Sequence, residues 1–467
     1  MSKYPLEPSR EEFESLMAEV VRRVAEHIES LPRQPAMNTD GAADFARGLI
    51  EPLPQKGEAS DALLDFLFQE AIPRSFTSAG PGYLAYVPGG GIVHAAIADF
   101  IATAVNRYVG VFAAAPALAQ LEANVVRWFS EIIGYPASAG GVLTSGGSMA
   151  NLTALVAARD ALSGDDFRQA ILYCSDQTHH SFQKAAHLAG FAYSQIRDVP
   201  SDSAFRIRID ALDESIARDR AAGLRPFLLL GSAGTTNTGA VDDLQALATV
   251  ARRESMWFHV DGAYGAFFML TERGRARLQG IEEADSLILD PHKTLFLPFG
   301  TGAVLVKDRA ALRRAHSLHA EYLPAMQEQE ELVDFCEISG ELSRDFRGLR
   351  VWLPLKMFGA APFRDQLDEK LDLIDYALEE LRQISGVEIV AEPQLTILAF
   401  RLKRAGSDLN DLNRRLLDRI NARKRVMLTS AMLNGDLVIR ICIVSHRTHR
   451  DRVEMAMEDI RAAVEEV

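Results

Sequence analysis

The chain has 467 residues, of which 48% are hydrophobic and 24% charged, a composition typical of a globular protein with two or three structural units. With 50 Lys and Arg against 64 Asp and Glu, its formal net charge is −14. It has no dense basic stripe, so we expect no nucleic-acid partner. The three cysteines, Cys174, Cys336 and Cys442, lack the spacing of a zinc site or of a disulfide framework, as is typical of proteins from a reducing cytosol.

The N-terminal segment is charged and amphipathic. Residues 10–72 contain helical patterns such as "EEFESLMAEVVRRVAEHI", and the chain's start lacks the apolar core of a signal peptide. No apolar run approaches the ~18–20 residues of a membrane span, so we expect a cytoplasmic protein without a membrane partner. Residues 1–80 have too little apolar surface to fold alone, which predicts a helical arm that packs on a larger unit or on a second subunit.

Between about residues 81 and 310, short apolar runs alternate with helical stretches. The predicted strands are "GVLTS", "AILYCS", "PFLLLGS", "MWFHVD", "SLILD" and "GAVLVKD". Doubly buried strands that alternate with helices indicate an α/β unit with a mainly parallel sheet. We place this large unit at residues 81–355 and a smaller α+β unit, with three helices and two apolar strands, at residues 356–467.

Polar residues follow several of these strands directly. Ligands of open α/β sheets gather beyond the carboxyl ends of the strands, so these residues are candidates for one site. They are residues 145–148, 176–180, 232–238, Asp261 and 290–293. In "TSGGSMANL" two glycines and Ser148 mark a strand-to-helix turn, which predicts either an anion site at the helix start or a plain turn with a serine cap.

Lys293 follows the apolar strand "SLILD", where a charged residue is unusual. It is either a lysine that extends to water or a nucleophilic amine able to form a Schiff base with a carbonyl. The second reading requires an aldehyde cofactor with an anionic group, namely pyridoxal 5′-phosphate (PLP), whose ring nitrogen needs a charged partner. Asp261 ends the strand "WFHVD" and is the candidate partner, although it could also be a strand-end cap.

His179 and His180 stand next to each other in "SDQTHHSFQKAA". Adjacent residues of a helix point in different directions, so they make a poor metal pair and we expect no metal site. One of them could stack on an aromatic ring, or neither has a role beyond the turn. The segment "GSAGTTNTG" is likewise either a plain loop or a wall of hydroxyl groups around a polar ligand.

The segments "TSGGSMANL", "SDQTHHSFQKAA", "GTTNTGAVDD", "HVDGAYGAF" and "DPHKTL", in this order and spacing, resemble the group II PLP-dependent amino-acid decarboxylases, which include the aromatic L-amino acid decarboxylases. The resemblance covers nearly the whole chain. It implies the fold-type-I architecture: a large domain with a seven-stranded, mainly parallel sheet between helices, a small C-terminal domain and an N-terminal arm. It also implies a homodimer with active sites at the subunit interface.

The resemblance implies a cofactor site at the positions that match the family's motifs: Gly147, Ser148, His179, Thr236, Asp261, Ala263, Asp290, His292 and Lys293. Lys293 would hold PLP covalently, and Asp261 would pair with the ring nitrogen. His179 and Ala263 would cover the two ring faces, Thr236 would lie at the polar edge, and the remaining residues would surround the phosphate. Asp290 stands where asparagine is common in the family, and Gly262 replaces a frequent alanine.

The same resemblance implies that Tyr322, in "HAEYLP", belongs to a mobile catalytic loop and protonates Cα after CO₂ leaves, with His179 in support. In relatives that form aldehydes oxidatively, one of these two residues is often replaced. Both are present here, which favours simple decarboxylation over oxidative aldehyde formation or transamination. A catalytically silent relative would be expected to have lost Lys293, Asp261 or Tyr322.

The substrate positions implied by the resemblance are Tyr86, Pro88, Tyr108, Ser343 and Arg344, with Tyr108 contributed across the dimer interface. These residues suit a flat aromatic side chain, and Ser343 resembles the serine of relatives that select phenols. We therefore expect a tyrosine- or DOPA-like L-amino acid as substrate, with a small acyclic amino acid as the alternative. Gly89 stands where aromatic decarboxylases carry a polar residue, so substrate anchoring differs at that point.

Overall fold

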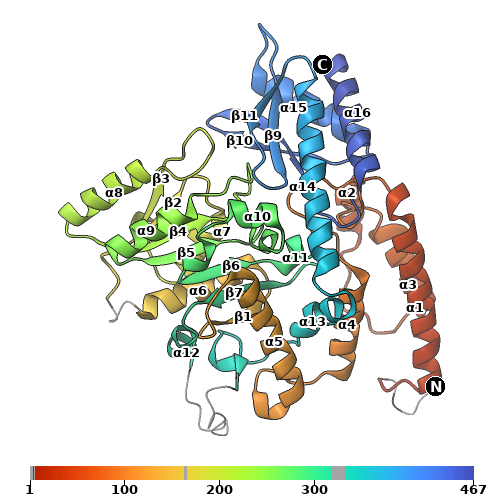
Figure 1. The fold of residues 1–467 in the computed structure, drawn as a ribbon. Coiled ribbons are helices and arrows are strands. Elements are labelled where there is room, and N and C mark those ends of the chain that lie inside the picture. Colours follow the sequence, from red (N-terminus) through yellow and green to blue (C-terminus); the bar gives the residue numbers. More distant parts are fainter. Residues whose placement is uncertain (1–3, 5, 162–165, 318–331) are drawn as a thin grey trace.

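The computed structural model describes residues 4, 6–161, 166–317 and 332–467. Within them, a seven-stranded sheet with the order β1-β7-β6-β5-β4-β2-β3 forms the centre of the larger unit (Figure 1). Its strands are β1 (Gly140–Thr144), β2 (Ala170–Ser175), β3 (Ile196–Val199), β4 (Arg225–Ser232), β5 (Trp257–Asp261), β6 (Ser286–Leu289) and β7 (Gly302–Val306). The predicted α/β fold with a mainly parallel seven-stranded sheet is confirmed.

Strands β3, β2, β4, β5 and β6 run parallel, whereas β7 pairs antiparallel with both β6 and β1. Two antiparallel pairings in succession restore the original direction. The carboxyl end of β1 therefore lies at the same edge of the sheet as those of β4, β5 and β6. This edge receives most of the loops whose polar residues stand out in the sequence.

Side chains of β4 alternate between two apolar layers because successive residues of a strand point to opposite faces. Leu228 and Leu230 pack in a cluster with Phe182 of α7 (His180–Leu188), whereas Leu229 packs with Leu247 of α9 (Leu244–Glu254). Helix α6 (Gly147–Ala161) joins the first layer, and α5 (Pro116–Ile133) and α8 (Ile209–Ala221) join the second. Both faces of the sheet are thus covered, which explains the nearly continuous apolar strands.

A second, antiparallel sheet with the order β10-β11-β9-β8 forms the C-terminal unit. Its strands are β8 (Val387–Ala391), β9 (Ile397–Leu402), β10 (Thr429–Leu433) and β11 (Asp436–Cys442), and they pack with α14 (Ala361–Arg382), α15 (Leu409–Ala422) and α16 (Arg450–Glu466). Figure 1 shows this unit above the larger sheet. Apart from those of the N-terminal arm, the other α-helices of the described residues are α4 (Val93–Val105), α10 (Glu272–Arg277), α11 (Pro291–Thr294), α12 (Ala310–His316) and α13 (Gly348–Phe358).

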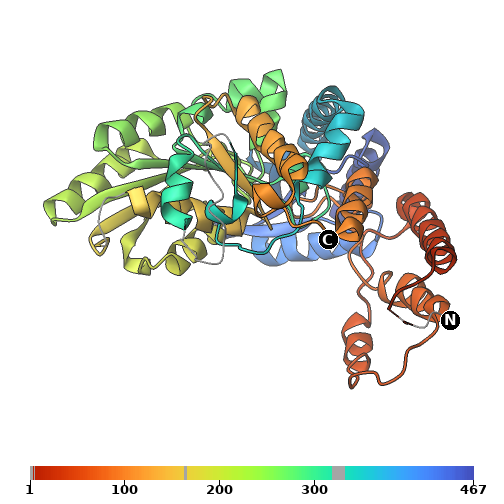
Figure 2. The same ribbon diagram turned by 90° about the horizontal axis from the view of Figure 1, so that it is seen from below.

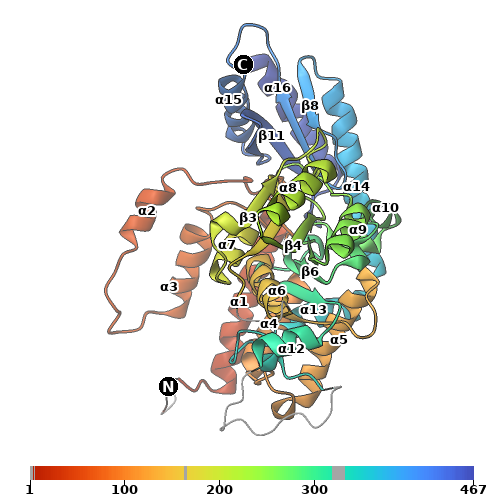
Figure 3. The same cartoon turned by 90° about the vertical axis from the view of Figure 1, so that its left-hand side faces the viewer.

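The N-terminal arm contains α1 (Arg10–Ser30), α2 (Ala42–Gly48), α3 (Ser60–Asp65) and the short π-helix η2 (Phe66–Ala71). Helix α1 begins at Ser9, whose hydroxyl accepts from the backbone N–H of Glu12 while the Glu12 carboxylate accepts from the N–H of Ser9. The arm projects from the two sheets (Figures 2 and 3), and no residue of α1 is fully buried. Among the described residues, no helix is both long enough and apolar enough to cross a bilayer.

Candidate active site

A cavity of about 370 Å³ lies at the carboxyl edge of the large sheet. The nine residues expected to hold the cofactor all line it: Gly147, Ser148, His179, Thr236, Asp261, Ala263, Asp290, His292 and Lys293. They come from five separate loops that follow β1, β2, β4, β5 and β6. The sheet direction described above brings these loops together, as expected for ligand sites of open α/β folds.

Lys293 lies on α11, a single helical turn that begins at Pro291, directly after β6. Its Nζ atom is 3.1 Å from Oδ2 of Asp290, and its side chain is 23% exposed while that of Asp290 is 4% exposed. The lysine therefore does not extend to bulk water along the sheet. It lines the cavity, held by a carboxylate at the strand end.

The Asp290 carboxylate lies close to the start of α6 because two neighbouring residues, Gly147 and Gly302, have no side chain. A Cβ atom at Gly147 would lie 3.0 Å from Oδ2 of Asp290, and one at Gly302 would lie 2.8 Å from Oδ1 and 2.5 Å from the backbone of Gly146. Oδ1 of Asp290 is buried and has no hydrogen-bond partner among the described residues. Only glycine at these positions allows the close packing that forms the turn.

The turn "SGGS" opens helix α6, whose first residue is Gly147. The hydroxyl of Thr144 donates to the carbonyl oxygen of Gly146 at 3.0 Å and shapes the turn. The start of a long helix offers backbone N–H groups and the positive end of the helix dipole, so this end of the cavity suits an anionic group such as a phosphate.

Asp261 ends β5, opposite Ser232 of β4 and Ile288 of β6. Its Oδ1 accepts a hydrogen bond of 3.1 Å from the N–H of Ala263. Ser232 and Thr235 also line the cavity. A carboxylate at the inner end of the cavity is a suitable partner for a positively charged ring nitrogen.

His179 is the N-cap residue of α7. Its Nδ1 lies 2.8 Å from Oγ of Ser181 and accepts from the Ser181 N–H at 3.3 Å. Burial lowers the pKa of His179, the Asp261 carboxylate opposes this shift, and the Lys293 ammonium adds to it. Near neutral pH, the imidazole that lines the cavity is therefore uncharged.

The residues expected at the substrate do not line this cavity in the single chain. Tyr86 is 54% exposed, adopts a positive φ of 54° and stacks on Tyr83 with ring centroids 6.3 Å apart. Pro88 is buried. Its neighbour Gly89 packs against the backbone of α11, since a Cβ atom at Gly89 would lie 2.2 Å from the carbonyl oxygen of His292.

Tyr108, Ser343 and Arg344 form a second group of expected substrate residues. The hydroxyl of Tyr108 donates to the carbonyl oxygen of Leu342 at 2.7 Å, and Ser343 is exposed. Arg344 is fully buried in an ion pair of 2.6 Å with Glu122 and lies over the ring of Phe335. In the single chain Arg344 is thus a packing residue. Tyr322 lies outside the described residues.

Four lining residues have no place in the sequence-based site: Met149, Ser181, Tyr264 and Ile288. Tyr264 shares a hydrogen bond of 2.7 Å with the hydroxyl of Thr396, which joins the cavity to the small C-terminal unit. Ser181 and Tyr264 directly follow motif residues in the sequence, and this position beside the motifs could have identified them as candidates. Ile288 looks like any strand residue, and no sequence signal distinguishes it.

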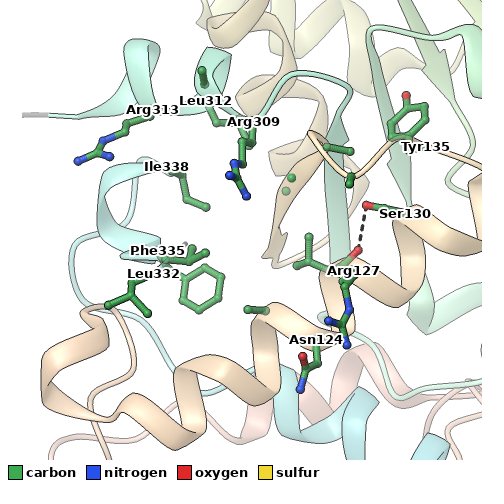
Figure 4. Close-up of a pocket in the computed structure, with 18 of the residues that line it drawn as sticks. Asn124, Arg127, Ser130, Tyr135, Arg309, Leu312, Arg313, Leu332, Phe335 and Ile338 are labelled. Atoms are coloured by element: carbon green, nitrogen blue, oxygen red, sulfur yellow. Dashed lines mark hydrogen bonds between the residues drawn. The ribbon is translucent and has the colours of Figure 1, made fainter. Parts of the chain in front are cut away.

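A larger cavity of about 630 Å³ lies between α5, α12 and residues 332–338 (Figure 4). Its described lining residues include Arg127, Arg309 and Arg313 around apolar side chains such as Phe335 and Ile338, but no lysine, histidine or cysteine. It therefore lacks a nucleophilic amine. The smaller cavity is the active-site candidate because it contains Lys293, His179 and Asp261, although it has the smaller volume.

The residues of the smaller cavity fit PLP. An amine, an anion-binding helix start and an inner carboxylate match the aldehyde, the phosphate and the ring nitrogen of that cofactor. A Cβ atom at Gly147 would lie 3.0 Å from the Asp290 carboxylate, so glycine at this position lets the start of α6 pack closely against the strand end that carries Lys293.

Comparisons with known proteins agree with this site. Residues 45–403 match the model of the pyridoxal-dependent decarboxylase conserved domain. Over 99% of its length the chain is 37% identical to an aromatic-L-amino-acid decarboxylase of Bacillus atrophaeus, covering 97% of that protein. It is 31% identical to the aromatic-L-amino-acid decarboxylase of Bos taurus, covering 96% of this chain and 95% of that protein.

Among solved structures, the chain resembles the Oryza sativa TDC with PLP and tryptamine. The TM-score is 0.93 at 26% identity, covering 100% of this chain and 99% of the other. The family match spans well over half of the chain, and the two relatives extend along almost all of it. The protein is therefore a member of the pyridoxal-dependent decarboxylase family, a PLP-dependent amino-acid decarboxylase.

Proposed function

We propose that this enzyme converts an aromatic L-amino acid, with a tyrosine- or DOPA-like side chain preferred, into the corresponding amine and CO₂. The observation that carries the proposal is the convergence of Lys293, Asp261 and His179 in one cavity. The relatives named as aromatic-L-amino-acid decarboxylases, which align along almost the whole chain, support the aromatic class.

When bound, PLP supplies an aldehyde that joins covalently to an amine and a ring that accepts the electron pair of the breaking C–CO₂ bond. Lys293 is the amine that would hold it, and Asp261 would balance the charge of the ring nitrogen. His179 and Ala263 would lie against its two faces. Gly147, Ser148 and His292 would surround the phosphate at the start of α6, with Thr236 at the polar edge.

The protein's part in the reaction is orientation and proton control. The cavity must hold the substrate so that its carboxylate points out of the plane of the cofactor ring, because the bond in that position breaks. The carbon left behind must take up a proton, and we assign its delivery to Tyr322, with His179 in support. An uncharged His179 close to Asp261 suits that supporting role, since it can hold or pass a proton near neutral pH.

We also infer that the enzyme works as a homodimer. Phe13, Leu16 and Val21 of α1 are exposed in the single chain, although they are apolar and close together in sequence. A second copy of the chain over this helix would bury them and would bring a second Tyr108 near the cavity. Light scattering of the purified protein should give twice the chain mass. A monomer that is fully active would contradict this inference.

The mechanism is tested by reducing the holoenzyme with borohydride and mapping the label by mass spectrometry. A pyridoxyl group on Lys293 is expected, and a label elsewhere would overturn the assignment. The matched control is Lys307→Arg, because Lys307 follows β7 and pairs with Glu283 away from the cavity.

The substrate class is tested by screening the common L-amino acids and L-DOPA for CO₂ release. We expect phenolic substrates to react fastest. Release of CO₂ only from acyclic amino acids would contradict the aromatic proposal. Production of an aldehyde, ammonia and hydrogen peroxide would instead indicate oxidative chemistry, and a keto acid would indicate transamination. A location in the cytoplasm stays a prediction that cell fractionation can test.

A further inference from the structure

A chain of polar side chains runs through the core from β5 and β6 to His179. Nε1 of Trp257 lies 2.8 Å from Oγ of Ser286, which lies 2.7 Å from Nδ1 of His259. Nε2 of His259 lies 2.9 Å from Oδ1 of Asn151. The chain then continues through Ser181, whose Oγ is 3.1 Å from Nδ2 of Asn151 and 2.8 Å from Nδ1 of His179.

The inner members of this chain have no access to water. Ser286, His259 and Asn151 are each 0% exposed, so their polar atoms must satisfy one another. Burial lowers the pKa of His259 to about 4, although the nearby Asp261 carboxylate opposes the shift. His259 is therefore neutral near pH 7, with a single ring proton that can be on either nitrogen.

The inner end of the chain decides which nitrogen of His259 carries the proton. The indole N–H of Trp257 can only donate, so Oγ of Ser286 accepts from it. Of the partners that the described residues offer Oγ of Ser286, only Nδ1 of His259 can accept the hydroxyl proton. Nδ1 of His259 is then the acceptor, and Nε2 carries the proton and donates it to Oδ1 of Asn151.

The hydrogen bonds at the His179 end of this series run in the same donor-to-acceptor direction, and this follows from a separate contact. The backbone N–H of Ser181 can only donate, and it points at Nδ1 of His179. At 3.3 Å this bond is long and favours a lone pair on Nδ1 only weakly, whereas the 2.8 Å contact makes the hydroxyl proton of Ser181 the main donor to that nitrogen. Because its proton goes to His179, Oγ of Ser181 accepts from Nδ2 of Asn151. Oδ1 of Asn151 in turn accepts from Nε2 of His259.

We propose that the chain Trp257–Ser286–His259–Asn151–Ser181 is a one-directional hydrogen-bond relay that holds His179 as the neutral tautomer with its proton on Nε2. His179 lines the cavity, so this arrangement presents a ring N–H and not a ring lone pair to the reacting groups. Asn151, Ser181 and His259 are positioning residues that act through His179. The assignment of the His179 tautomer rests on the hydrogen bonds of the relay. Its consequence for catalysis rests on the proposed function.

The tautomer is measured directly by ¹⁵N NMR on protein labelled at its histidines, with the His179 signals assigned by a His179→Gln variant. In the wild-type holoenzyme we expect Nε2 of His179 to be protonated and Nδ1 to be unprotonated. A wild-type signal with the proton on Nδ1 would overturn the proposal, whatever the variants do.

Two variants test the relay. In Asn151→Asp the new carboxylate still accepts from His259 but cannot donate to Ser181, whose hydroxyl then turns toward it and leaves Nδ1 of His179. We expect the proton to move toward Nδ1, kcat to fall at least about tenfold, and the acidic limb of the kcat pH profile to shift upward. Ser181→Ala should give a mixture of tautomers, and Ser181→Thr, which keeps the hydroxyl, should restore the wild-type signal.

Thr153→Val is the matched control, because Thr153 is also buried on α6 but its hydroxyl donates only to the Met149 carbonyl oxygen. If Asn151→Asp and Ser181→Ala both leave the His179 signals and the pH profile unchanged, the relay does not exist. The expected tautomer in a protein that releases no CO₂ would leave the relay standing and would refute the proposed function alone.

Discussion

Nζ of Lys293 lies 3.1 Å from Oδ2 of Asp290, which precedes the single helical turn α11 that carries the lysine. The carboxylate is almost fully buried, so its charge attracts the ammonium without competition from water and holds the lysine at the wall of the cavity. The same carboxylate also packs against the glycine turn at the start of α6, where we place the phosphate of the cofactor. Asp290 therefore stands between the two groups that would hold PLP.

Asp290→Asn should tighten PLP binding. The amide keeps the shape of the side chain but removes a negative charge beside the phosphate position, and we expect the Kd of PLP for the apoenzyme to fall by about tenfold. Titration of the apoenzyme by absorbance would measure this. Asp308→Asn, an exposed change beyond β7, should leave the Kd unchanged. Weaker binding by Asp290→Asn would show that the carboxylate is needed as an acceptor.

The buried ion pair of Arg344 and Glu122 predicts a large stability effect. Both side chains are 0% exposed and lie 2.6 Å apart. Glu122→Gln leaves the guanidinium without a counter-charge and should lower the free energy of unfolding by about 3–5 kcal/mol. Combining it with Arg344→Met removes the unpaired charge and should recover part of the loss.

Urea unfolding followed by fluorescence would measure these changes. Asp210→Asn, at an exposed pair with Arg208, should leave the midpoint unchanged. Equal midpoints for Glu122→Gln and the wild type would mean that the pair is not buried in the working enzyme.

His446 predicts a loss of stability in mild acid. Burial, with the Arg447 charge as a smaller cause, lowers the pKa of His446 to about 3 from its usual 6.5. The folded protein thus stays neutral at this ring while the unfolded chain takes up a proton below pH 6.5. The free energy of unfolding should therefore fall as the pH drops from 6.5 toward 3, by roughly 3–5 kcal/mol at most.

Denaturant unfolding at several pH values would test this effect. His446→Gln should show a smaller fall than the wild type, because glutamine does not titrate. His187→Gln, on an exposed helix position, should keep the wild-type slope. Parallel curves for the wild type and His446→Gln would rule out the linkage.

Gly89 should not tolerate a side chain. A Cβ atom there would lie 2.2 Å from the carbonyl oxygen of His292 and 2.7 Å from that of Lys293, so Gly89→Ala must push α11 away. We expect a loss of about 1–3 kcal/mol in the free energy of unfolding and weaker PLP binding. Gly48→Ala, where a Cβ would meet nothing within 4 Å, is the matched control and should bind PLP normally.

The sequence alone was sufficient for the strands that are buried on both faces, because their apolar runs are nearly continuous. Strand β3 escaped prediction, since Ile196–Val199 is a short edge strand that is only partly buried. That the residues expected to hold the cofactor line one cavity was predictable for a related reason. Each lies at a strand end or within a few residues beyond it, and parallel strands bring their carboxyl ends to one edge.

Tertiary structure alone decided which polar residues meet inside the core. Arg344 matches a substrate position in sequence, yet in the single chain its charge is neutralised by Glu122 of α5. Asn151, His259 and Ser286 are ordinary helix and strand residues in sequence, and only packing of α6 on β5 aligns their hydrogen bonds. Local pattern determines secondary structure and the residues at strand ends, whereas buried charges and protons depend on distant partners that only the folded chain brings within hydrogen-bond distance.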